Sequence, residues 1–325
     1  MIGIGVDIGG TFVKIVVLNE NGTTVHTEKF ETHSVKTAQQ FIARIGQSVN
    51  EIKAKFAGQQ LAVAVGAPGD VDNKQGILRY NPNLHFEDLV NDWPIAKMLY
   101  ENTGIRPEVV NDASLAAWGV YEKDLQRKPC NVLVVTMGTG IGGGLIINRE
   151  LYQGSHGSAG EIGHTKIDDV TTGPQCGCGA HGCLEAFVGT IGIKRRVRAA
   201  MEAFPHSELA KCVGDGDFKI AAVAEAAKKG CPAALKIWED TGRYLGIGIA
   251  NFALILDMDA VVLTGGVSGA APYFMPALMK VLSDQQIKTP FQHLQVLVSK
   301  TPDIGGVGAA LFALHQARHA TTPCA

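Results

Sequence analysis

Residues 2–18 read IGIGVDIGGTFVKIVVL, and residues 131–147 read NVLVVTMGTGIGGGLII. In each stretch, two runs of apolar and β-branched residues flank a turn rich in glycine, a pattern that predicts two antiparallel strands joined by a tight turn. We interpret the second stretch as an internal duplication of the first. The sequence therefore predicts two similar halves, each of which opens with a strand, a glycine turn and a second strand.

Strands and helices alternate along the rest of the chain, which is typical of an α/β fold. Hydrophobic periodicity predicts further strands at 24–30, 61–65, 108–110, 260–264 and 294–298, and helices at 35–56, 95–102, 113–121, 221–229, 233–256, 273–282 and 307–318. No low-complexity linker separates the halves. We expect the first domain to end near Asp112 and the last helix to pack back on it.

Length, composition and charge exclude several classes of protein. A chain of 325 residues suggests two domains, and 46% hydrophobic against 18% charged residues excludes a mainly disordered protein. The formal charge of -2 provides no global basic field for nucleic acid or an anionic membrane. The longest apolar stretch, around 245–256, is too short to cross a bilayer, and the first residues do not read as a signal peptide. We therefore expect a cytoplasmic protein with neither nucleic-acid nor membrane partners.

The glycine turns of the two hairpins predict a nucleotide site. In the first turn, a carboxylate at a strand end precedes two glycines and a hydroxyl, so backbone N–H groups can approach phosphate oxygens while the aspartate holds Mg²⁺. The alternative is an ordinary hairpin with an incidental aspartate. The second turn repeats this geometry, and a glycine pair ends the strand at 260–264, so three turns could surround one nucleotide. The residues concerned are Asp7, Gly9, Gly10, Thr11, Gly138, Thr139, Gly140, Gly265 and Gly266.

Other nucleotide-binding motifs fit less well. Gly138-x-Gly140-x-x-Gly143 matches the dinucleotide fingerprint of NAD enzymes, but that fingerprint requires a helix after the glycines, and residues 145–147 continue as a strand. The sequence contains no Gly-Lys dipeptide, which excludes a Walker P-loop. The duplicated hairpin is therefore the preferred interpretation.

One cluster of residues has the spacing of a metal site. His164 is followed by Cys176, Cys178 and Cys183 in a stretch rich in glycine, while the other cysteines are scattered along the chain. Three thiolates and one imidazole complete a tetrahedral Zn²⁺ site with no open position, so the metal would be structural. The alternative is three reduced surface cysteines and an unrelated histidine.

Two glutamates, Glu161 and Glu185, flank this cluster. If one ring nitrogen of His164 binds metal, the other could face outward with Glu161 and Glu185, an array suited to the hydroxyls of a sugar. Solvated surface carboxylates are the alternative.

Asn111 and Asp112 lie at a strand-to-helix junction, where ligands often bind and helix caps are also common.

Five motifs follow one another along the chain: DIGGT at 7–11, APG at 67–69, ND at 111–112, the run 137–164 that ends in GEIGH, and CGCGAHGCLE at 176–185. In these motifs the chain resembles the ROK family of repressors, open reading frames and kinases, nearly end to end and closest to its glucokinase branch. The resemblance implies an actin/hexokinase-like fold of two RNase H-like domains, with ATP and a sugar in a cleft between them, in a homodimer. The domains would be 1–112 with about 305–325, and 113–304 with the zinc site.

The resemblance also implies roles for single residues. Asp112 is similar to the family's catalytic base, and the three glycine turns match its nucleotide site. The implied sugar ligands are Gly69, Asn111, Asp112, Glu161, His164 and Glu185, and the implied zinc ligands are His164, Cys176, Cys178 and Cys183.

The expected activity is transfer of the ATP γ-phosphoryl group to the 6-hydroxyl of a hexose, with glucose as the first candidate and N-acetylmannosamine, N-acetylglucosamine and fructose as alternatives. Asp112 would accept the proton of the attacking hydroxyl, while Mg²⁺ near Asp7 and the N–H groups of the glycine turns take up phosphate charge. A sugar-sensing regulator of the family would carry a helix-turn-helix before the first strand, and here that strand begins at Ile2, so we expect an enzyme. A chaperone-type ATPase would keep the glycine turns but have no use for the glutamates and histidine beside a zinc cluster.

Overall fold

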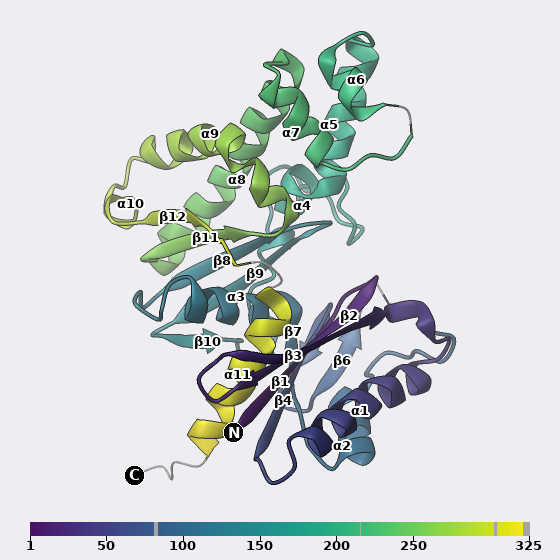
Figure 1. Cartoon of the computed structure of the whole chain (residues 1–325). Coiled ribbons are helices and arrows are strands. Elements are labelled where there is room, and N and C mark those ends of the chain that lie inside the picture. The colour runs from purple at the N-terminus through teal and green to yellow at the C-terminus, as the bar shows by residue number, and fades with distance from the viewer. Residues whose placement is uncertain (81–83, 215, 302–303, 321–325) are drawn as a thin grey trace. The chain divides into compact units, whose positions relative to one another are not determined.

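Two five-stranded sheets form the framework of the computed structural model, which describes residues 1–80, 84–214, 216–301 and 304–320 (Figure 1). The chain divides into two compact units. Unit 1 holds Met1–Lys128, Gly144–Gly160 and the chain from Lys300 onward, and unit 2 holds Pro129–Gly143 and Glu161–Ser299.

The first sheet, in unit 1, has the strand order β3-β2-β1-β4-β7. Strand β1 pairs antiparallel with β2 and parallel with β4, so the opening hairpin and the following parallel strands share one sheet. The elements of this unit are β1 (Ile2–Ile8), β2 (Phe12–Asn19), β3 (Thr24–Glu31), α1 (Ala38–Lys55), β4 (Leu61–Ala67), β5 (Asp70–Asp72), β6 (Ile77–Tyr80), α2 (Ile95–Thr103), β7 (Glu108–Asn111), α3 (Asp112–Lys123), β10 (Glu150–Tyr152) and α11 (Ile304–Ala320).

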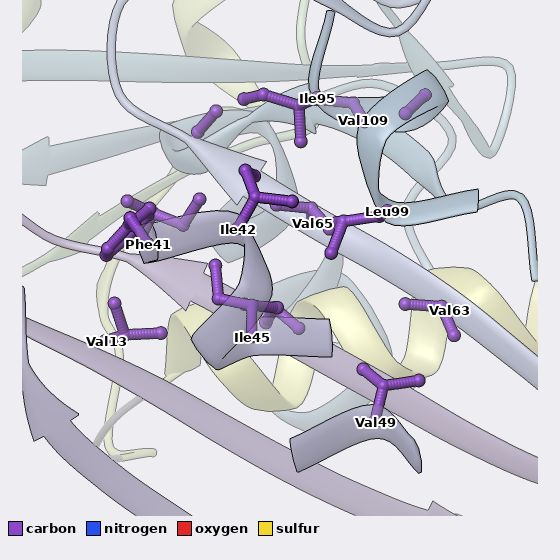
Figure 2. Close-up of a cluster of buried hydrophobic side chains, with 14 of the residues drawn as sticks. Val13, Phe41, Ile42, Ile45, Val49, Val63, Val65, Ile95, Leu99 and Val109 are labelled. Carbon is purple, nitrogen blue, oxygen red and sulfur yellow. The ribbon is translucent and has the colours of Figure 1, made fainter. Parts of the chain in front are cut away.

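The alternation of side chains along β1 decides which helices cover each face of this sheet. Every second residue from Ile2 to Ile8 joins a buried core with apolar side chains of α1 and α2, part of which Figure 2 shows. Gly3 and Gly5 lie on the other face, which α11 covers. A Cβ built on Gly5 would lie 2.2 Å from the carbonyl oxygen of Gly306, so the missing side chain allows the helix backbone to approach the strand.

The second sheet has the order β10-β9-β8-β11-β12, which repeats the order of the first. Strand β11 pairs parallel with β8 and β12, and β9 pairs antiparallel with β10. The predicted duplication is therefore confirmed. The remaining elements are β8 (Val132–Met137), β9 (Ile141–Ile147), α4 (Leu184–Val188), α5 (Thr190–Ala203), α6 (Glu208–Val213), α7 (Ala221–Lys228), α8 (Pro232–Leu256), β11 (Ala260–Thr264), α9 (Ala271–Ser283), α10 (Thr289–Gln292) and β12 (Gln295–Val298).

The predicted strands and helices all coincide with observed ones, with ends that differ by three residues or fewer. The prediction missed the helices α4, α5, α6 and α10 and the short strands β5, β6 and β10. Helix α3 and residues 144–160 lie in unit 1, although the predicted second domain begins at residue 113. Compact units need not coincide with domains, so the predicted domain boundaries stay a prediction. Residues 321–325, which the prediction assigns to the first domain, lie outside the described residues. In the described part of the chain, no helix has both the length and the apolarity needed to cross a bilayer.

Candidate active site

The glycine turn of unit 1 connects β1 to β2 and is fixed by backbone contacts. The N–H of Gly9 donates to the carbonyl of Phe12 at 3.0 Å, and the hydroxyl of Thr32 donates to the carbonyl of Gly9 at 2.6 Å. Gly10 and Thr11 are exposed, so this end of the hairpin is accessible to a ligand. Asp7 precedes the turn, and its carboxylate lies beside the start of α11, where a Cβ built on Gly305 would be 2.6 Å from Oδ2.

Asn111 and Asp112 stand where β7 ends and α3 begins. The Asn111 Oδ1 accepts hydrogen bonds from the N–H groups of Ala113 (3.0 Å) and Ser114 (3.2 Å), so this residue caps the helix. Its amide donates to the carbonyl of Gly69 at 3.1 Å. Asp112 is the first residue of α3 and is half-buried, and its Oδ1 accepts the N–H of Ala113 at 2.8 Å. The Asn111 side chain thus connects Gly69, which precedes β5, to the strand-to-helix junction that carries Asp112, the predicted base.

The glycine turn of unit 2 connects β8 to β9 and is held by residues of α4 and α5. Within the turn, the N–H of Gly138 donates to the carbonyl of Gly140 at 3.0 Å. The Thr190 hydroxyl donates to the Gly138 carbonyl at 2.7 Å, and the Ile141 N–H donates to Glu185 Oε2 at 2.9 Å. Thr139 at the tip of the turn is exposed. The turn therefore has fixed ends and an open tip.

The third glycine turn follows β11 and lies against the end of β8. Gly265 has a φ of 91°, a conformation that favours glycine, and a Cβ there would lie 2.5 Å from the carbonyl oxygen of Met137. Gly265 and Gly266 are both exposed. Because Met137 immediately precedes Gly138, unit 2 brings the second and third predicted nucleotide turns together.

The four predicted metal ligands meet in unit 2. Their donor atoms all lie within 4.8 Å of one another, with 3.7 Å between His164 Nδ1 and Cys176 Sγ and 3.8 Å between the Sγ atoms of Cys178 and Cys183. A tetrahedral zinc ion with Zn–S bonds of about 2.3 Å would separate two sulfur ligands by about 3.8 Å. The donor set and its spacing therefore fit Zn²⁺.

The local environment changes the acidity of two of these thiols. Burial raises the pKa of the Cys176 thiol above its usual range. Burial also acts to raise the pKa of the Cys178 thiol, but hydrogen bonds, chiefly from the backbone N–H of Ala180, outweigh it and lower this pKa. The Lys166 ammonium donates to Cys183 Sγ at 2.7 Å. Such a cation stabilises thiolate, which is the form that binds metal.

The three predicted sugar ligands of unit 2 point in different directions. The Nδ1 of His164 faces the cysteines, while its Nε2 lies 3.8 Å from Glu161 Oε2, and these two side chains are 40% and 52% exposed. Glu185 is turned inward instead, with Oε1 at 3.2 Å from Cys176 Sγ and Oε2 bound to the N–H of Ile141. Glu161 and His164 therefore face solvent together, whereas Glu185 connects the cysteine cluster to a glycine turn.

Sequence reasoning missed the contribution of Thr190, the first residue of α5. The signal for it was weak, because α5 buries few large apolar side chains, Ile193 and Val197 among them, beside a run of basic residues at 194–196. The pair Gly189-Thr190, where α5 begins, was the available indication of a helix start.

The comparisons with known proteins agree with these motifs. The profile of the ROK family matches residues 3–316. The chain belongs to the ROK family. A glucokinase of Streptomyces coelicolor is 32% identical over 284 residues, which are 85% of this chain and 86% of the relative. An N-acetyl-D-glucosamine kinase of Histophilus somni is 31% identical and covers 95% of this chain and 98% of its own length.

Solved structures extend the likeness to three dimensions. The structure of a ROK family glucokinase from Streptomyces griseus in complex with glucose and AMPPNP has a TM-score of 0.79 and 31% identity, and the match covers 97% of this chain and 100% of that one. This ROK protein therefore has the predicted fold of ROK sugar kinases, that of the actin/hexokinase ATPases. The family's relatives also include a putative xylose repressor from Caldicellulosiruptor.

Proposed function

We propose that this ROK protein is an ATP-dependent kinase that phosphorylates the 6-hydroxyl of a hexose, with glucose as the preferred acceptor. The observation that carries the proposal is the position of Asp112: a half-buried carboxylate on the first residue of α3, next to a cap that also binds the Gly69 carbonyl. Glucokinases at about a third sequence identity over most of the chain support it.

The proposed roles follow from the chemistry of each group. Asp112 accepts the proton of the attacking sugar hydroxyl, and Glu161 and His164 bind other hydroxyls. The glycine turns offer N–H groups to the phosphates of ATP. A magnesium ion would be held near Asp7, and when bound it neutralises phosphate charge.

We also propose that His164 and the three cysteines hold a structural zinc ion. Four protein ligands leave no position for an activated water, so this metal would fix the segment of Glu161 and His164 against the start of α4, which carries Glu185. Homodimer formation and a cytoplasmic location stay predictions.

A coupled assay of ADP release tests the reaction. We expect activity with glucose, to be compared with N-acetylglucosamine, N-acetylmannosamine and fructose, and with polyphosphate in place of ATP. The Asp112→Asn variant keeps the shape of the side chain but removes the base, and it should lower kcat by at least about 100-fold. As a control, Asp284→Asn changes an exposed carboxylate that pairs with Lys280, and it should leave kcat unchanged.

Two results would contradict the proposal. Near wild-type turnover by Asp112→Asn would remove Asp112 from the reaction. Sugar binding without consumption of ATP would favour the alternative of a non-catalytic regulator, a class that also occurs among the relatives.

A further inference from the structure

We infer that Glu185 is a positioning residue of the nucleotide site: its carboxylate holds the β8–β9 turn in place and joins that turn to the His/Cys cluster. The inference rests on the proposed nucleotide role of this turn. It assigns to Glu185 an effect on ATP affinity that a residue acting on sugar hydroxyls alone would not have.

The first support is a hydrogen bond to the backbone at the end of the turn. Ile141 is the first residue of β9, and its N–H donates to Glu185 Oε2 at 2.9 Å. Ile141 is 5% exposed, so water has little access to replace this acceptor. A hydrogen bond to a carboxylate is stronger than one to a neutral group, and losing it would leave the N–H without that partner.

The second support is the close fit between the carboxylate and Gly140. A Cβ built on Gly140 would lie 2.2 Å from Glu185 Oε2, well inside contact distance. Position 140 can therefore accept no side chain while Glu185 keeps its place. The missing side chain at Gly140 therefore leaves room for the Glu185 carboxylate, in addition to allowing a phosphate to approach the backbone.

The third support is that the same short segment also holds the other end of the turn. The Gly189 N–H donates to the Glu185 carbonyl at 2.9 Å, where α4 ends and α5 begins. The next residue, Thr190, donates its hydroxyl to the Gly138 carbonyl at 2.7 Å. Residues 185–190 thus bind both the entry and the exit of the turn.

The segment is itself attached to the His/Cys cluster. Cys183 immediately precedes α4, and the N–H of Leu184 donates to the carbonyl of Thr165, the residue that follows His164. Glu185 Oε1 lies 3.2 Å from Cys176 Sγ. A shift of the cluster would therefore move the carboxylate that supports the turn.

The test measures nucleotide and sugar affinity separately, by calorimetry with AMPPNP and with glucose. Glu185→Ala should weaken AMPPNP binding by about ten- to a hundredfold, the loss expected for one hydrogen bond to a charged acceptor. Glu161→Ala is the matched control, because it removes a neighbouring carboxylate that faces solvent beside His164. It should leave the AMPPNP dissociation constant within about twofold of the wild type while it weakens glucose binding.

Variants at other positions of the turn provide further tests, so the result does not depend on Glu185→Ala alone. Gly140→Ala should weaken AMPPNP binding in the wild-type chain, and this loss should be much smaller in the Glu185→Ala background, because the carboxylate that clashes with the new methyl group is gone. Thr190→Val removes the other support with little change in shape, and it should weaken AMPPNP binding by about fivefold. Circular dichroism melts of each variant show that it is folded before its affinity is interpreted.

Three results would overturn the inference. Unchanged AMPPNP affinity in Glu185→Ala, or fully additive losses in the double variant, would show that Glu185 does not position the turn, and the proposed kinase function would stand. A wild-type chain that binds glucose but not AMPPNP would overturn the nucleotide role of the turn, and the inference with it.

Discussion

Replacing Gly308 by alanine tests the packing that holds the helix of Asp112. Gly308 lies in α11 against α3, and a Cβ built there would be 1.9 Å from the carbonyl oxygen of Leu115 and 3.0 Å from the backbone N of Gly119. Both atoms belong to the backbone of α3, so no side-chain rotation can relieve the overlap. One helix must move away from the other.

The magnitude follows from two opposing effects. Overpacking a well-packed interior costs typically about 1–3 kcal/mol, and an overlap this deep belongs at the upper end. Alanine gains about 1 kcal/mol over glycine in a helix. We therefore expect Gly308→Ala to lower the free energy of unfolding by about 2 kcal/mol, or the midpoint by about 4–8 °C for a unit of this size.

Thermal unfolding followed by circular dichroism measures this change. Gly269→Ala serves as the control, because a Cβ there meets no heavy atom within 4 Å, and its midpoint should stay close to the wild type. The reasoning about the helix contact is refuted if Gly308→Ala melts at or above the wild-type temperature.

Three further predictions concern a helix cap, a buried histidine and the metal. Asn111→Ala should cost about 1–2 kcal/mol in urea unfolding, because α3 loses its cap; equal midpoints would count against the capping role. Burial lowers the pKa of His315, whose Nε2 lies 2.9 Å from Glu150 Oε2, below its ordinary 6.5. The unfolded chain therefore binds the proton at higher pH than the folded one. The contribution of neutral, buried His315 to the free energy of unfolding is complete above pH 6.5 and is lost as the pH falls through the folded pKa. His315→Gln should lack this loss between pH 7.5 and pH 5, and parallel curves for the two proteins would contradict it. Chelation of zinc should lower the unfolding midpoint and added Zn²⁺ should restore it, whereas identical melts with and without metal would argue against a structural ion.

The duplicated hairpin and the metal cluster could be predicted because their signals are local. Strand pairing across a glycine turn depends on residues a few positions apart, as at 2–18 and 131–147. The ligand types and short spacings of 164–183 likewise predict the His/Cys cluster without the fold. The same stretch predicted that Glu161, His164 and Glu185 face outward together, and the structure shows this for Glu161 and His164 but not for Glu185.

Only the tertiary structure shows where Glu185 points and why position 140 requires glycine. The hydrogen bond that the Ile141 N–H donates to Glu185 joins residues 44 positions apart, and no periodicity within either segment predicts it. Gly5 is a similar case, because its approach to Gly306 brings together the two ends of the chain. Local sequence determines which elements form, since backbone propensity and apolar period act over a few residues. Packing between distant elements decides which carboxylate reaches which N–H, since that depends on distances that only the folded chain sets.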